Sequence, residues 1–259
     1  MVNVGLVQLA VDSNEAVADR ISRGLWMADQ AAQAADVVVL PELWPAGAFD
    51  LEASVEHAEP INGPLVKALS KIASKQNVWL HGGSFVEVDD TGRHFNTSVA
   101  FGPDGSFAAI YRKIHLFGFD SGEAAVLEGG QDIVVVNSPL GRTGLSTCYD
   151  LRFPELFREQ MSRAAQAMVM CSGWPTSRIA RWTVLATARA IENQTWFVGC
   201  NAVGTNGGVK MGGESLIVDP WGEVVVQADD TEQILYADID PNYPDQVRAD
   251  FPVLRDRVL

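Results

Sequence analysis

The sequence is short of cysteine, histidine and basic residues. Its 259 residues include 3 Cys and 4 His, and 19 Lys and Arg stand against 33 Asp and Glu, for a formal net charge of −14. So few cysteines, widely spaced and without a C-x-x-C pair, exclude a disulfide framework and a zinc site and predict reduced thiols in the cytoplasm. The acidic excess excludes nucleic acid and anionic membrane surfaces as partners, since both attract Lys and Arg.

Long hydrophobic runs and cofactor motifs are also missing. The apolar stretches, such as Val-Val-Val-Leu-Pro at 37–41, have the length of a strand and are far too short to cross a bilayer. The first residues lack the basic start and the cleavage site of a signal peptide, so we expect none. No G-x-G-x-x-G follows the first predicted strand, and no H-E-x-x-H or Cys/His cluster occurs. We therefore expect neither a dinucleotide-binding site nor a metal-dependent hydrolase.

The hydrophobic pattern predicts two copies of one strand–helix plan. The first copy has strands at 2–9, 37–40, 78–81, 97–101 and 108–111, and helices at 14–35 and 65–76. The second has strands at 144–147, 168–171, 196–200, 215–218 and 224–226, and helices at 154–165 and 179–193. Ser13 or Asn14 is expected to cap the first helix, and residues 42–64 are expected to form a loop.

This repeat predicts an α/β fold with two pseudo-symmetric halves in a single domain, residues 1–259. Two such halves can pack sheet against sheet with helices outside, as a four-layer α-β-β-α sandwich. A doubly wound single sheet is the alternative, but Pro/Gly turns at 102–105 and 219–222 favour two sheets. Residues 241–259, rich in Pro, Asp and Arg, are expected to form an irregular tail packed across the body or a partner subunit.

Cys148 is the strongest candidate for chemistry, because it follows a predicted buried strand and α/β sheets hold ligands at the carboxyl ends of strands. A thiol needs a base or a positive field to attack at neutral pH. All four histidines precede Cys148, with His115 the nearest. Glu42 ends the equivalent strand of the first half and is the other candidate base. Lys113 ends the strand at 108–111.

Three segments resemble the signature motifs of the carbon–nitrogen hydrolase (nitrilase) superfamily. They are Leu-Pro-Glu at 40–42, Tyr-Arg-Lys-Ile-His-Leu at 111–116 and Cys-Tyr-Asp-Leu-Arg-Phe-Pro-Glu-Leu at 148–156. The segments at 188–193 and 213–220 extend the resemblance, and all five run in the family's order. The family has an α-β-β-α sandwich, which agrees with the fold expected from the repeat.

The resemblance implies a Glu-Lys-Cys triad made of Glu42, Lys113 and Cys148. It also implies a supporting glutamate between the lysine and the cysteine, for which Glu123 fits best and Glu128 competes. In such a triad the glutamate takes the thiol proton as sulfur attacks an amide carbon. The lysine and the backbone N–H of Tyr149 would stabilise the oxyanion. Ammonia leaves, and water hydrolyses the remaining thioester without a metal or cofactor.

The segment Trp-Pro-Thr-Ser-Arg at 174–178, followed by Arg-Trp at 181–182, resembles the ω-amidase-type branch. That branch acts on monoamides of short dicarboxylic and 2-oxo acids, such as 2-oxoglutaramate. Arg178 or Arg181 is therefore expected to bind a substrate carboxylate. Phe119, Trp174 and Tyr149 are expected to wall the pocket.

Other functions of the same fold stay open at this point. A nitrile hydrolase or a ureido or carbamoyl hydrolase would use the same triad, and a non-catalytic homodimeric scaffold would keep the fold without turnover. The expected partner is a small-molecule amide. The resemblance also suggests a homodimer or higher homo-oligomer, with the helices at 154–165 and 179–193 as contact surfaces.

Overall fold

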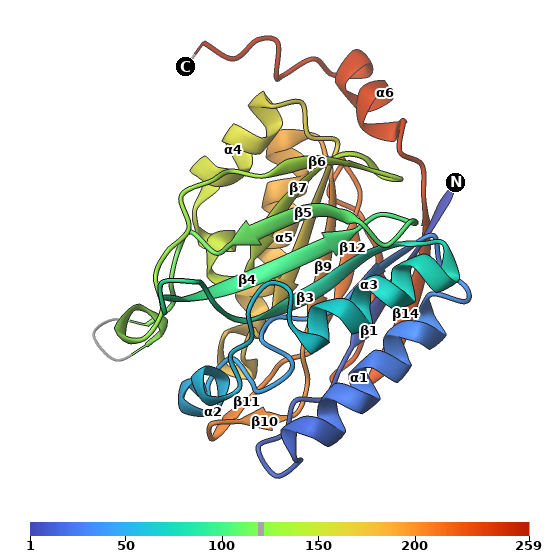
Figure 1. The fold of residues 1–259 in the computed structure, drawn as a ribbon. Helices are drawn as coiled ribbons and strands as arrows, with labels where there is room; N and C mark the ends of the chain where they lie inside the picture. Colours follow the sequence, from blue (N-terminus) through green and yellow to red (C-terminus); the bar gives the residue numbers. More distant parts are fainter. Residues whose placement is uncertain (119–121, 259) are drawn as a thin grey trace.

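The computed structural model describes residues 1–118 and 122–258 and contains two six-stranded sheets (Figure 1). The first sheet has the order β14-β1-β2-β3-β4-β5, with β1 (Val2–Gln8), β2 (Val37–Val39), β3 (Trp79–Val88), β4 (His94–Phe101), β5 (Phe107–Arg112) and β14 (Gln233–Ile239). The second has the order β13-β12-β9-β8-β7-β6, with β6 (Val135–Ser138), β7 (Gly141–Thr147), β8 (Ala167–Ser172), β9 (Trp196–Asn201), β12 (Leu216–Val218) and β13 (Val224–Gln227). Strands β10 (Thr205–Asn206) and β11 (Val209–Lys210) form a small separate ribbon.

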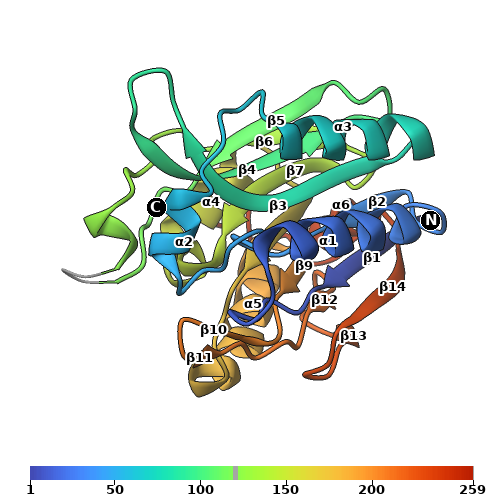
Figure 2. The same cartoon turned by 60° about the horizontal axis from the view of Figure 1, so that its bottom comes forward.

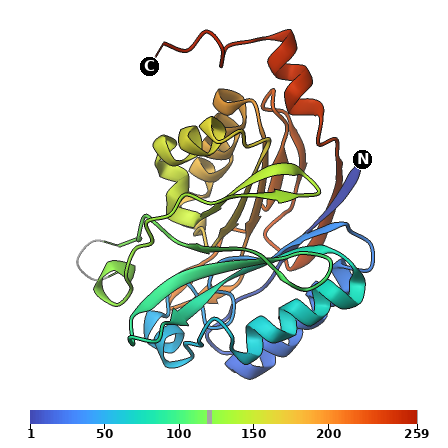
Figure 3. The ribbon, with the colours of Figure 1, turned by 45° about the horizontal axis from the view of Figure 1, so that its top comes forward.

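Helices cover the outer face of each sheet (Figure 3). Helices α1 (Val17–Ala31) and α3 (Pro64–Gln76) lie side by side on the first sheet, and α4 (Pro154–Ser162) and α5 (Ile179–Asn193) lie on the second (Figure 2). The shorter helices are α2 (Leu51–Glu56), α6 (Tyr243–Asp250) and the 3₁₀ turns η1 (Glu123–Ala125), η2 (Cys148–Arg152) and η3 (Thr176–Arg178).

The two halves follow one plan, as the sequence pattern predicts. Strands β1, β2 and β3 pair in parallel, and so do β7, β8 and β9. In each sheet the third parallel strand is followed by two antiparallel neighbours, and an antiparallel strand closes the opposite edge. That closing strand is β6 in the second half and β14, from the end of the chain, in the first. The pseudo-symmetric four-layer sandwich is confirmed.

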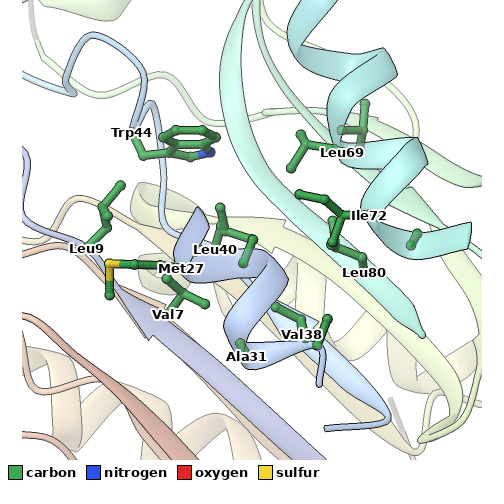
Figure 4. Packing of buried hydrophobic residues seen from close by; sticks show 14 of the residues in the cluster. Val7, Leu9, Met27, Ala31, Val38, Leu40, Trp44, Leu69, Ile72 and Leu80 are labelled. Carbon is green, nitrogen blue, oxygen red and sulfur yellow. The ribbon is translucent and has the colours of Figure 1, made fainter. Parts of the chain in front are cut away.

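The central strands β2 and β8 are buried on both faces, which explains their apolar runs. On β1, Val4 and Leu6 pack in the cluster between the two sheets, whereas Val7 packs with α1 and α3 on the outer side. Figure 4 shows this outer cluster, in which Val38 and Leu40 meet Ile72 of α3 and residues of α1. A shift of one residue in the register of these strands would move each side chain from the layer between the sheets to the outer layer, or the reverse.

Several local expectations were wrong. Helix α1 begins at Val17, after Ala16 and without a side-chain cap. Ser13 accepts a hydrogen bond from the Gly207 N–H at 2.9 Å instead, because the β10–β11 ribbon lies against it. The predicted loop at 42–64 contains α2, and β6 and β14 were not predicted at all.

The expected irregular tail at 241–259 is also corrected, since residues 243–250 form α6. Pro244 suits the first turn of a helix, and it is buried together with Val247. Arg248 then donates to the carbonyl of Ala165 at 2.7 Å, which fixes α6 beyond the end of α4. Within the described residues, no helix has the length and apolar character required to cross a membrane.

Candidate active site

Three elements bring the predicted residues together. Glu42 lies just after β2, Cys148 directly after β7, and Lys113 directly after β5. All three line one pocket. The packing of the two sheets thus joins strand ends that are more than 100 residues apart in the chain.

The turn that carries Cys148 is strained and is held in place by the hydrogen bonds of Asp150. Cys148 adopts φ +44°, a left-handed conformation that costs a non-glycine residue on the order of 1 kcal/mol. Thr147 and Asp150 form a reciprocal capping box across the turn. Asp150 is fully buried and also accepts from Tyr111 Oη at 2.7 Å and from the His115 N–H at 3.1 Å. The thiol-bearing turn is therefore tied to the segment that carries Lys113.

Lys113 lies between two buried carboxylates. Its Nζ is 2.8 Å from Glu42 Oε1 and 2.5 Å from Glu123 Oε2, and each of the three side chains is 3% exposed or less. Burial opposes the ammonium charge, but the Glu123 and Glu42 carboxylates outweigh it and raise the pKa of Lys113 well above its usual value. Lys113 is therefore a fixed cation rather than a base.

Each carboxylate has further donors. Glu42 Oε2 accepts from the Gly173 N–H at 2.9 Å, and Glu123 Oε2 accepts from the Phe117 N–H at 2.6 Å. Asn96 of β4 donates to both Glu42 and Glu123. Burial is the main cause that raises the pKa of Glu123, and the charge of Glu42 adds to it while Lys113 opposes it. The competing Glu128 lies on the surface, 3.6 Å from Arg93 Nη1.

Cys148 is the cysteine that reaches the pocket. Burial raises the pKa of its thiol well above the usual value, and the Glu42 charge adds to this while Lys113 opposes it. The group is thus a neutral thiol at pH 7 and needs a neighbouring base to attack. Cys171 and Cys200 are fully buried, and burial raises the pKa of Cys171 to about 12.

The pocket wall combines aromatic rings with two arginines. Phe117 meets Tyr149 edge to face at 5.3 Å between ring centres, and Trp174 also lines the pocket. The guanidinium of Arg178 lies 5.0 Å from the centre of the Phe117 ring, and that of Arg152 lies 4.9 Å from the Trp174 ring. Within the part of the chain that the structure describes, neither arginine pairs with a carboxylate. Two positive charges are thus available to an anionic ligand.

Some of the remaining predicted residues line the pocket and others do not. Tyr149, Trp174 and Arg178 line the pocket, as expected. Arg181 lies exposed on α5 and is not among the pocket residues. His115 accompanies Asp150, with its Nδ1 2.7 Å from Oδ1, and does not line the pocket either. Phe119 lies outside the described residues.

Sequence reasoning missed several residues at the site. Arg152 belongs to the motif at 148–156 and lies four positions after Cys148. On a short helical turn, that spacing could have indicated that its side chain lies near the thiol. Phe49 and Phe117 come from long connecting segments and gave no signal. Asn96 looked like an ordinary strand residue, because its importance arises from the pairing of β4 with β5.

The chain is similar to known proteins over nearly its whole length. The model of the carbon-nitrogen hydrolase family matches residues 3–249. A 2-oxoglutaramate amidase of Paenarthrobacter nicotinovorans is 40% identical over 98% of this chain and 89% of its own, and the human omega-amidase NIT2 is 35% identical over 98% and 94%. The crystal structure of Saccharomyces cerevisiae Nit3, a nitrilase superfamily member, superposes with a TM-score of 0.89 at 30% identity, over 100% of this chain and 97% of that one. The chain belongs to the carbon–nitrogen hydrolase family and is an enzyme that cleaves carbon–nitrogen bonds of the amide type.

Proposed function

We propose that this enzyme is an ω-amidase, which releases ammonia from the monoamide of a short dicarboxylic or 2-oxo acid. The observation that carries the proposal is the pair Arg152 and Arg178, whose guanidinium groups line the same pocket as Cys148. A substrate that presents an amide to sulfur and a carboxylate to these arginines satisfies both ends of the site. The relatives named as 2-oxoglutaramate amidase and omega-amidase support this substrate class.

The proposed triad is Glu42, Lys113 and Cys148, supported by Glu123 and Tyr149. Glu42 takes the thiol proton as Cys148 attacks the amide carbon, which gives a tetrahedral oxyanion. Lys113, held charged between its carboxylates, and the backbone N–H of Tyr149 stabilise that oxyanion. Glu42 returns the proton to the leaving nitrogen and ammonia departs. Glu42 then deprotonates a water that hydrolyses the thioester.

Binding is assigned to the pocket wall. Arg178 and Arg152 hold the carboxylate, and Trp174 and Tyr149 enclose the carbon chain. Aromatic rings beneath the guanidinium groups fix these arginines before a substrate arrives, which reduces the entropy lost on binding. Arg181 has no part in this assignment, because it is exposed on α5 outside the pocket lining.

The test is ammonia release from matched substrates. Succinamate, the corresponding nitrile and a ureido acid of similar length are compared with the wild type and with Cys148→Ala. The proposal expects turnover of the ω-amide by the wild type and none by the variant, with normal circular dichroism of both. Preferred release from the nitrile or the ureido acid would assign the triad to one of those activities instead. Turnover by Cys148→Ala would refute the triad.

We further propose a homodimer formed through α5 and its surroundings. Val184 and Ile191 of α5 are 66% and 48% exposed, seven residues apart and hence on one face of the helix. Trp221 and Phe251, also exposed, stack 6.0 Å apart. Sedimentation of Val184→Asp/Ile191→Asp is expected to give a monomer. Trp26→Asp, at an equally exposed site on α1, is the control that should leave the dimer intact.

Two broader assignments complete the proposal. Residues 1–259 are taken to act as one carbon–nitrogen hydrolase domain, which the match over residues 3–249 supports. A cytoplasmic location is supported by three cysteines that are all free and buried in the described structure. Fractionation of cells that produce the protein tests the location.

A further inference from the structure

Asn96 bridges the same two carboxylates that hold the ammonium of Lys113. Its Nδ2 lies 2.9 Å from Glu42 Oε1 and 2.7 Å from Glu123 Oε1. Lys113 Nζ bridges the same two groups, so Glu42, Lys113, Glu123 and Asn96 form a closed ring of hydrogen bonds. The backbone carbonyl of Asn96 also accepts a hydrogen bond from the backbone N–H of Lys113 at 2.9 Å. One residue therefore positions all three charged members of the ring.

The orientation of this amide is determined by its partners. Ionised carboxylates only accept hydrogen bonds, so the NH₂ group and not the oxygen must face Glu42 and Glu123. The Oδ1 atom is buried and has no hydrogen-bond partner among the described residues. A buried amide oxygen without a partner is unfavourable. The conformation persists because both N–H groups are committed to the two carboxylates.

The ring carries two negative charges and one positive charge in a buried setting. The other titratable groups close to it are the thiols of Cys148 on η2 and Cys171 on β8, whose pKa values both respond to the charge of Glu42. Neither thiol supplies a positive charge. The excess negative charge is instead offset by neutral donors, which are the two amide hydrogens of Asn96 and the backbone N–H groups of Gly173 and Phe117.

We propose that Asn96 is a positioning residue for catalysis, which holds Glu42 and Glu123 together and keeps Glu42 available as the base. This inference rests on the proposed roles of Glu42 and Cys148. Without the amide, a carboxylate that has lost an N–H donor retains its proton to higher pH. The acid limb of activity then moves upward in pH, an effect that a packing role alone does not produce.

The experiment compares Asn96→Ala and Asn96→Asp across a pH series of kcat/KM for succinamate. The alanine variant is expected to lose activity about 10-fold to 100-fold at pH 7, with its acid limb raised by about one pH unit. The aspartate variant keeps the shape of asparagine but adds a third carboxylate, so its loss should be larger. A packing role predicts the reverse order, because alanine leaves the larger cavity.

Asn193→Ala is the matched control. Asn193 is equally buried, lies on α5 and also has an Oδ1 without a partner among the described residues. Its loss should leave the acid limb where it is in the wild type. An unmoved limb in Asn96→Ala, or a milder loss in Asn96→Asp than in Asn96→Ala, overturns the inference. Asn96→Ser, which keeps one donor, gives an intermediate shift and replaces alanine if that variant does not fold.

Alkylation separates this inference from the proposed function. The rate of Cys148 modification by iodoacetate, followed by mass spectrometry as a single adduct, reports the thiol–Glu42 pair without any amide and should fall in Asn96→Ala. Wild-type turnover with a normal pH profile in the Asn96 variants would refute only the role of Asn96. Undiminished turnover in Cys148→Ala would refute the proposed triad, and a wild type that does not turn over succinamate would refute the proposed function itself.

Discussion

The sharpest test of substrate choice is the replacement of the two pocket arginines. Arg178→Met and Arg152→Met remove a guanidinium but keep an unbranched apolar chain over the Phe117 and Trp174 rings. The local packing is thereby largely retained. What each variant loses is one positive charge that has no carboxylate partner among the described residues.

The magnitude follows from the kind of contact. A hydrogen bond to a charged group contributes about 1.5–3 kcal/mol, and 1.36 kcal/mol corresponds to about a factor of ten in rate. Removal of one arginine is thus expected to lower kcat/KM for succinamate by about 10-fold to 150-fold. For 4-oxopentanamide, a neutral amide of nearly the same shape, the change should stay within about twofold.

The assay is ammonia release with both amides, on wild type, the two single variants and the double variant. Arg181→Met serves as the control, since this arginine is exposed on α5 outside the pocket lining. A double loss that departs from the sum of the single losses places both arginines on one carboxylate. Equal losses on the acid and the neutral amide would refute the reasoning, as would equal use of both amides by the wild type.

Three further predictions concern the architecture of the site. The raised pKa of Glu123 contributes stability at low pH that is lost as the pH rises through that pKa, so the stability of Glu123→Gln relative to the wild type should increase in urea titrations as the pH rises above the usual glutamate pKa of about 4.3; a relative loss with rising pH would contradict this. Asp150→Ala leaves the buried Tyr111 hydroxyl without its partner and should lower the free energy of unfolding by about 3 kcal/mol, whereas a change below about 1 kcal/mol would show that the network is dispensable. Because Cys148 has φ +44°, Cys148→Gly should unfold at no lower temperature than Cys148→Ala by calorimetry, and a clearly more stable alanine variant would exclude strain at this turn.

The central strands and their helices were predictable because their signals are local. The runs around Val38 and Val169 are apolar on both faces, and their residues are buried as that pattern requires. Strand β14 escaped prediction because its pairing with β1 joins opposite ends of the chain, about 230 residues apart. Helix α6 escaped because a short Pro- and Asp-rich segment forms a helix only where the body offers partners such as the Ala165 carbonyl.

The candidate site also combines residues that local motifs predict with residues that only long-range contacts reveal. Glu42, Lys113 and Cys148 stand in motifs that are recognisable residue by residue. The choice of Glu123 as the supporting glutamate depends on where the segment after Lys113 folds back, and no local pattern separates Glu123 from Glu128. Asn96 needed the register of β4 against β5, because its side chain matters only beside Glu42 and Glu123.

By itself, the sequence determined the repeated α/β plan, the family and the residues proposed as the triad, because hydrophobic period and short motifs are properties of neighbouring residues. Only the tertiary structure decided which groups surround that triad, because strand order and sheet packing bring together residues far apart in the chain. It placed Asn96 against two carboxylates, left Arg181 outside, and brought Arg152 beside Trp174. A chain with a net charge of −14 thus has two arginines in the wall of one pocket, since local packing and not overall charge sets the field there.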